Sequence, residues 1–339
     1  MRRLIELQQK LLPDLIHVLR ERYMLLRSIY HLQPIGRRGL AQAMDTTERI
    51  LRAEVELLKE NGLLHVTAAG MSLSAEGLQV LDEMEPLFGE LFGLKELAER
   101  LQQKLGISEV IVVSGNADQS PWVKEELGRV GARVLKQVVQ EGDIVAVTGG
   151  TSIASVAKHL SPSPAFRNVQ FVPARGGLGE RVELQANTLA SAMAARTGGT
   201  YRLLHVPDRL HPEALQTLVK EPQVQDVLTL LRDTRIVLHG IGDALTMARR
   251  RNYSPEELQE LEAAGAVSEA FGYYFNEAGE IVQRMPTIGL QLEEVHKAET
   301  VLSIAGGESK AKAILSFAKQ SCQNVLITDE GAAKSLLST

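Results

Sequence analysis

The chain has 339 residues, 44% of them hydrophobic, which is enough for sizeable cores in two or three domains. Its formal net charge of −5 excludes a generally basic nucleic-acid coat protein, so any affinity for nucleic acid must be local. A single cysteine, Cys322, excludes an intramolecular disulfide framework, and because no run approaches roughly 18 apolar residues we expect a cytoplasmic protein with no membrane partner.

The first 73 residues follow the order of a winged helix-turn-helix. Apolar residues at helical spacing predict a first helix within Leu11–Tyr30. A short helix is expected around Leu40–Met44, and Thr47 is suited to cap a longer helix because its hydroxyl can accept a free backbone N–H. Leu63–Val66 and Met71–Leu73 are predicted to pair as the hairpin of a wing. This order of elements places a helix in the major groove of DNA.

The longer helix of this module is amphipathic. Its predicted apolar stripe consists of Leu51, Val55 and Leu58, widened by Ile50 and Leu57. Its opposite face carries Arg49, Arg52, Glu56 and Lys59. The residues that we expect to contact double-stranded DNA are Thr47, Glu48, Arg49 and Arg52.

The full order of elements favours this interpretation over an ordinary solvated helix, and the distribution of charge supports it. Residues 1–60 contain 11 Lys and Arg against 8 Asp and Glu, a net charge of +3, whereas the other 279 residues contain 26 against 34, a net charge of −8. The basic excess therefore coincides with the predicted DNA-binding helix. A net charge of +3 is modest, so a second subunit is needed for tight binding to DNA.

The segment after the wing has two interpretations. A helical pattern begins at Ser74, and leucines at heptad-like spacing continue it from Phe88 to Leu105. This segment is either a connecting or dimerising helix, or a helix that packs within the larger domain.

From Glu109 onward, short β-rich runs alternate with glycine loops and helical stretches, which predicts a mainly parallel α/β sheet. The candidate strands are Val110–Val113, Ile144–Thr148, Val169–Val172, Tyr201–Val206, Arg235–His239, Val301–Ile304 and Val325–Thr328.

Four loops that follow candidate strands are rich in glycine and polar residues: Val147–Ala157, Pro173–Glu180, His239–Arg251 and Ala305–Ile314. Ligands of open α/β sheets bind at such loops, and bare backbone N–H groups at a helix start suit phosphate. One such loop alone is a routine turn, but four together favour an anionic ligand. Neither the GxGxxG nor the P-loop motif is complete, so no nucleotide is indicated.

Signatures of catalysis are missing. The chain has no GxSxG, HExxH or CxxC motif, and its eight histidines are scattered. Cys322 is interpreted as a packed residue. Glu269 either accepts hydroxyl groups of a sugar or is a solvated loop carboxylate.

The chain resembles the SorC family of bacterial transcription regulators over nearly its whole length. Besides the winged helix, the resemblance rests on VTGGTS at residues 147–152, ARGGLGE at 174–180, HGIGDA at 239–244, GAVSEAFGYYFN at 265–276, AGGESKAKAI at 305–314 and ITDEGAA at 327–333.

The resemblance implies a winged helix-turn-helix DNA-binding domain with a connecting helix at residues 1–88. Residues 89–339 would form a Rossmann-like, doubly wound α/β domain that resembles sugar-phosphate isomerases and deaminases and serves effector binding and oligomerisation. The implied function is repression of glycolytic genes by a dimer or tetramer without a cofactor, controlled by fructose 1,6-bisphosphate.

The resemblance also implies roles for individual residues. Gly149, Gly150, Thr151 and Ser152 would bind a phosphate, and Lys310 would neutralise one. Glu269 stands where many relatives have an aspartate. Many relatives have an aliphatic residue at the position of Arg175, so this guanidinium would add a fork for a second phosphate, with Arg250 as another candidate. Gln185 completes the expected effector-binding set.

Two alternatives stay open from the sequence. The larger domain alone permits a sugar-phosphate isomerase or deaminase, although the chain offers no general base at a known spacing. A SorC-type regulator that answers to a different sugar or polyol phosphate is the other.

Overall fold

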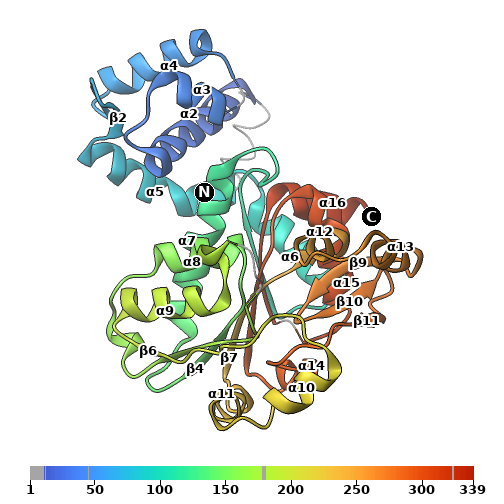
Figure 1. Cartoon of the computed structure of the whole chain (residues 1–339). Helices are drawn as coiled ribbons and strands as arrows, with labels where there is room; N and C mark the ends of the chain where they lie inside the picture. The colour runs from blue at the N-terminus through green and yellow to red at the C-terminus, as the bar shows by residue number, and fades with distance from the viewer. Residues whose placement is uncertain (1–10, 12, 45, 178–180, 323) are drawn as a thin grey trace. The chain divides into compact units, whose positions relative to one another are not determined.

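The computed structural model describes residues 11, 13–44, 46–177, 181–322 and 324–339, so residues 178–180 of the predicted second glycine loop lie outside the described residues. The chain divides into two compact units (Figure 1). The first unit consists of residues within 1–96 together with residues 119–123, and the second unit consists of residues 97–118 and 124–339. In the described part of the chain, no helix is both long and apolar enough to cross a bilayer.

The first unit has the predicted order of a winged helix-turn-helix. Its elements are α2 (Pro13–Leu32), α3 (Arg37–Ala43), α4 (Glu48–Glu60), β1 (Leu64–Thr67), β2 (Gly70–Leu73) and α5 (Ala75–Leu91). β1 and β2 pair as an antiparallel hairpin. Ile35 exchanges two backbone hydrogen bonds with Met71, of 3.1 and 2.8 Å, which attaches the segment before α3 to the wing. The predicted module is therefore confirmed.

The two faces of α4 are largely as predicted. Thr47 caps the helix, since its Oγ1 accepts a hydrogen bond from Ile50 N at 3.4 Å. Leu51, Val55 and Leu58 are buried in the core of the unit. The assignment of Ile50 to the apolar stripe is wrong, because its side chain is 61% exposed. One residue step rotates a helix by about 100°, so the position before Leu51 points away from the core.

The predicted helix over residues 88–105 is interrupted. α5 ends at Leu91 and α6 spans Leu94–Leu105, with Gly93 between them at φ 68°. A positive φ suits glycine and ends a helix. Leu101 is fully buried within the chain, as expected for a helix that packs against its own domain.

The second unit is built on seven parallel strands, in the order β3-β13-β12-β7-β4-β5-β6. Their bounds are β3 (Glu109–Val113), β4 (Ile144–Val147), β5 (Gln170–Pro173), β6 (Thr200–Tyr201), β7 (Ile236–Gly240), β12 (Thr300–Ile304) and β13 (Val325–Asp329). All seven predicted strands are present. Six of them agree with the prediction to within one residue at each end, whereas the strand expected over residues 201–206 is reduced to β6 and continues as a loop.

Helices cover both faces of this sheet. They include α7 (Pro121–Val138), α8 (Thr151–His159), α9 (Ala186–Thr197), α11 (Pro222–Arg232), α15 (Ala311–Ala318) and α16 (Glu330–Ser338). Figure 1 shows α8 and α9 on one side of the strands and α15 and α16 on the other. From β4 the chain proceeds through β5 to β6, and from β7 through β12 to β13 in the opposite direction. The carboxyl ends of β4 and β7 therefore form a topological switch point.

A second, smaller sheet was not predicted. Its four antiparallel strands are β8 (Gly242–Asp243), β9 (Ala266–Ala270), β10 (Tyr273–Asn276) and β11 (Ile281–Arg284). Phe271 and Gly272 connect β9 to β10 with φ values of 55° and 85°. This two-residue turn matches the twist of a hairpin. The remaining helices are α10 (Pro212–Leu218), α12 (Ala244–Arg250), α13 (Pro255–Ala263), α14 (Leu292–Val295) and the 3-10 turns η1 (Pro164–Phe166), η2 (Val182–Leu184) and η3 (Glu308–Lys310).

A buried histidine lies in the centre of the large sheet. His239 on β7 is fully buried, with Nε2 2.5 Å from Ser303 Oγ and Nδ1 3.1 Å from Gly240 O. Its neutral ring therefore has a partner at each nitrogen. Burial lowers the pKa of His239 from 6.5 to about 4, although the carbonyl of Gly240 and the carboxylate of Glu269 oppose this.

This pKa predicts a loss of stability in acid. Between pH 6.5 and 4 the unfolded chain binds a proton at His239 that the folded chain does not. The free energy of unfolding should fall by up to about 3 kcal/mol as pH decreases through this window. In urea denaturation at pH 7 and 4.5, His239→Gln should lose less stability with acid than the wild type. His205→Gln, at an exposed position, is the control, and an equal loss in all three proteins would contradict the role of His239.

Candidate effector pocket and DNA-contacting helix

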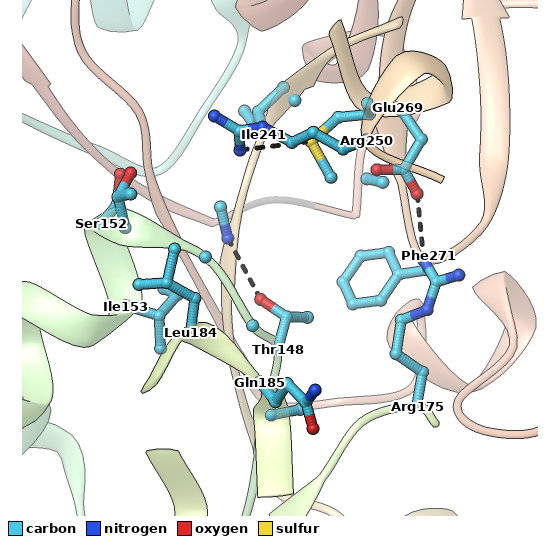
Figure 2. Close-up of a pocket in the computed structure, with 18 of the residues that line it drawn as sticks. Thr148, Ser152, Ile153, Arg175, Leu184, Gln185, Ile241, Arg250, Glu269 and Phe271 are labelled. Carbon is cyan, nitrogen blue, oxygen red and sulfur yellow. Dashed lines mark hydrogen bonds and ion pairs between the residues drawn. The ribbon is translucent and has the colours of Figure 1, made fainter. Parts of the chain in front are cut away.

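A pocket lies at the carboxyl ends of β4 and β7, where the direction of the chain reverses (Figure 2). The loops after β4, β5, β7 and β12 line it, together with the turn between β9 and β10. All nine residues that we expected to bind an effector are among its lining residues: Gly149, Gly150, Thr151, Ser152, Arg175, Gln185, Arg250, Glu269 and Lys310. The fold therefore brings together residues that are up to 161 positions apart in the sequence.

One side of the pocket is the N-terminus of α8. Gly150 precedes the helix at φ 115°, a conformation that L side chains rarely adopt. A Cβ at Gly149 would lie 2.6 Å from Leu184 O, so only glycine fits there. The first amides of a helix lack intrahelical acceptors and carry partial positive charge. With the hydroxyls of Thr151 and Ser152, they form an arrangement that suits a phosphate.

Two cations of the pocket have no carboxylate partner. Lys310 Nζ donates a hydrogen bond to Ile241 O at 3.0 Å, and Arg250 Nη1 lies 4.0 Å from the sulfur of Met247. Among the described residues, neither forms an ion pair. Burial lowers the pKa of Lys310, as do the charges of Arg250 and Lys124. A bound anion would relieve this unfavourable positive potential.

The opposite side of the pocket is lined by Arg175, Arg251 and Glu269, and these three buried residues form ion pairs with one another or with a fourth, Asp208, which is not among the lining residues. Arg175 Nη1 lies 3.1 Å from Glu269 Oε1, and Arg175 Nη2 lies 2.6 Å from Asp208 Oδ1. Arg251 Nε lies 3.0 Å from Asp208 Oδ2, and Arg251 Nη2 lies 3.0 Å from Glu269 Oε1. We call these four residues the charge quartet. Their formal charges sum to zero, which makes their burial tolerable.

Glu269 stays ionised within the quartet. Burial alone would raise its pKa, but the guanidinium groups of Arg251 and Arg175 and the amide of Gly272, which donates to Oε1 at 2.9 Å, lower it overall. The alternative of a solvated loop carboxylate is wrong, because Glu269 is only 4% exposed and lies on β9.

Sequence reasoning missed two members of the quartet. Asp208 lies in the loop after β6, in a stretch partly predicted as strand, and no motif marks it. Arg251 is the last of three consecutive arginines at residues 249–251, and the sequence alone does not distinguish which of them faces the pocket. The structure places Arg250 and Arg251 in the lining, and Arg249 outside it.

Other chemistry is not evident in the described residues. They contain no group of three or more His, Cys, Asp or Glu side chains that could hold a metal ion. Cys322 is buried, and burial raises the pKa of its thiol to about 11, as expected for a packed residue rather than a nucleophile.

The four residues expected to contact DNA are all exposed at the beginning of α4. Glu48 pairs with Arg38 at 3.2 Å, whereas Arg49 and Arg52 form no ion pair with any described residue. On the same helix, Glu56 pairs with Arg37 at 3.5 Å and with Lys59 at 3.3 Å. The uncompensated positive charge of α4 is therefore concentrated on Arg49 and Arg52.

Comparisons with known proteins also divide the chain into a DNA-binding part and a sugar-binding part. Residues 18–88 match the family described as "CggR N-terminal DNA binding domain", and residues 89–338 match the family described as "Putative sugar-binding domain". The chain is 48% identical over 338 residues to the central glycolytic genes regulator of Priestia megaterium and 45% identical over 337 residues to that of Bacillus subtilis. In both comparisons, 99% of each chain is covered.

A solved structure gives the same result. The crystal structure of a "putative SorC family transcriptional regulator" from Enterococcus faecalis is 42% identical, with a TM-score of 0.67, and the match covers 71% of this chain and 99% of that chain. These relatives are transcriptional regulators, so the enzyme alternative is not retained. The chain belongs to the SorC family of transcriptional regulators, as a CggR-like member with an N-terminal DNA-binding domain and a sugar-binding effector domain.

Proposed function

We propose that this regulator represses glycolytic genes and that fructose 1,6-bisphosphate controls its affinity for the operator. The observation that carries the proposal is a pocket lined by a helix N-terminus and by two cations, Lys310 and Arg250, which form no ion pair with any described residue. The identity of 48% to a central glycolytic genes regulator supports glycolytic genes as the target. Residues 1–88 bind DNA, and residues 89–339 bind the effector and form the oligomer.

The pocket has complementary groups for each part of a sugar bisphosphate. Residues 149–152 and Lys310 bind one phosphate, while Arg250 and the guanidinium of Arg175 bind the other. Figure 2 draws Ser152 on one side of the pocket, and Arg175 and Glu269 on the other. Between the two ends, Glu269 accepts hydrogen bonds from sugar hydroxyls, and the amide of Gln185 accepts or donates them.

On the DNA side, α4 lies in the major groove of a half-site. Arg49 and Arg52 contact phosphates or base edges, with Thr47 and Glu48 beside them. The exposed side chain of Ile50 offers an apolar contact for a thymine methyl group. A dimer or tetramer supplies the second helix that the modest charge of one module requires.

Control by the effector is a linkage effect. Fructose 1,6-bisphosphate must bind more tightly to the state that holds the operator less well, and bound operator must weaken effector binding by the same factor.

Loss of Lys310 should weaken effector binding. Lys310→Met retains the length of the side chain but removes its charge, so the affinity for fructose 1,6-bisphosphate should fall by about 100-fold in calorimetry. Lys312→Met is the matched control, because Lys312 pairs with Glu277 on the surface and is absent from the pocket lining. Equal affinities for both variants would remove Lys310 from the phosphate site, and the absence of binding by the wild type would reject the proposed effector.

Loss of the two free arginines of α4 should weaken binding to the operator alone. Arg49→Ala and Arg52→Ala should each lower the affinity for operator DNA, and a contact to phosphate should also reduce the salt slope by about 1. Lys95→Ala removes an exposed positive charge outside α4 and is the control. If the arginine variants lose effector binding as well, the fold rather than a DNA contact has been damaged.

A panel of sugar and polyol phosphates in a thermal-shift assay separates fructose 1,6-bisphosphate from a different effector. The largest stabilisation at equal concentration should come from the bisphosphate, because a ligand stabilises the folded state by RT ln(1 + [L]/Kd) and the tightest ligand has the smallest Kd.

A further inference from the structure

The guanidinium of Arg175 is only partly used by its neighbours. Nη1 donates to Glu269 Oε1 at 3.1 Å. Nε and Nη2 are buried, yet they donate no hydrogen bond to any described residue. These two nitrogens form one edge of the guanidinium, which is the edge that binds a carboxylate or phosphate through two parallel hydrogen bonds. Arg175 is among the residues that line the pocket, and no described residue accepts a hydrogen bond from its buried edge.

Asp208 lies against this same edge. Its Oδ1 is 2.6 Å from Arg175 Nη2, but the two atoms are not aligned for a hydrogen bond, and Oδ1 has no other hydrogen-bond partner among the described residues. The contact is therefore an electrostatic attraction without the directional component. If Asp208 were only a structural partner of Arg175, we would expect it to accept two parallel hydrogen bonds from Nε and Nη2.

The position of Asp208 is fixed from the other side. Oδ2 accepts a hydrogen bond from Arg251 Nε at 3.0 Å, and the backbone N–H of Asp208 donates to Gly177 O at 2.8 Å. Asp208 is only 5% exposed, so water screens the charge of its carboxylate poorly. An anion that approaches Arg175 must replace the contact with Oδ1 and come close to a second negative charge.

We infer that Asp208 sets how strongly the Arg175 side of the pocket binds a second phosphate, and thereby how well the protein distinguishes a bisphosphate from a monophosphate. This inference rests on the proposed function. Asp208 competes with a bound phosphate for the Nε and Nη2 edge of Arg175. It keeps a buried guanidinium neutralised in the empty pocket, at the expense of affinity for the anion that displaces it.

The competition has a defined sign. Asp208→Asn retains the shape of the side chain and an oxygen for Arg251, but removes the negative charge. The charge of the quartet then becomes +1 in the empty pocket. The affinity for fructose 1,6-bisphosphate should increase by about tenfold, whereas that for fructose 6-phosphate should change by less than about twofold. A merely structural role would instead weaken both ligands together.

The test is calorimetry of the full chain with fructose 1,6-bisphosphate and fructose 6-phosphate. Asp226→Asn is the matched control, because it makes the same change of charge at an exposed position of α11. The thermal midpoint of each variant, and its affinity for operator DNA, are measured alongside. Tighter binding of the bisphosphate by Asp208→Asn, with both ligands unaffected by Asp226→Asn, supports the inference.

A second variant keeps the inference testable if the first one does not fold. If the excess positive charge prevents Asp208→Asn from folding, the double variant Asp208→Asn with Arg251→Gln restores neutrality and should still favour the bisphosphate over the monophosphate more than the wild type does. Unchanged or reduced preference in a folded variant overturns the role of Asp208 while leaving the proposed effector intact. Failure of the wild type to bind either sugar phosphate overturns the proposed function, and the inference with it.

Discussion

Arg175, Asp208, Arg251 and Glu269 hold one wall of the pocket, and each charge in this group is buried only because the others neutralise it. Moving a single ionised group out of water costs several kcal/mol, so removal of one member leaves an uncompensated charge. The quartet joins the loop after β5, the loop after β6, the end of α12 and the β9–β10 hairpin. The smaller sheet is thereby attached to the larger one at the site where an effector is proposed to bind.

The two sides of the pocket differ in whether their charges are balanced by other residues of the protein. The α8 side, with Lys310, carries a positive charge that pairs with no carboxylate among the described residues, and it suits an anion. The quartet side is neutral when empty, and an anion there must compete with Asp208. A ligand with one phosphate satisfies the first side alone. A ligand with two must also displace the internal counter-charge, which links the selectivity of the pocket to a residue outside the family motifs.

Local patterns sufficed for the strands of the larger sheet and for most of the candidate residues of the pocket. Buried parallel strands are continuous apolar runs, so segments such as Val110–Val113 could be identified without knowledge of their neighbours. Glycines 149 and 150 mark a turn that only glycine can form, which predicted this loop as a candidate for binding a phosphate. The amphipathic pattern of α4 predicted its buried residues, but not the exposure of Ile50, because one residue step at the edge of a stripe reverses the environment.

What local patterns could not provide are pairings between distant segments. Asp208 lies 43 positions from Arg251, and no periodicity connects them. The same holds for the smaller sheet, in which β8 pairs with β9 across two intervening helices. Glu269 could be proposed from its motif, yet its ionised state depends on two arginines that only the fold brings near.

The central claim is that occupancy of the effector pocket changes the affinity for the operator. Titration of operator DNA with the full-length protein, with and without saturating fructose 1,6-bisphosphate, tests it most directly. The account predicts that the ligand lowers the affinity or cooperativity of operator binding, with a coupling of about 5- to 150-fold. Identical titration curves at saturating ligand, in a protein shown by calorimetry to bind it, would contradict the account.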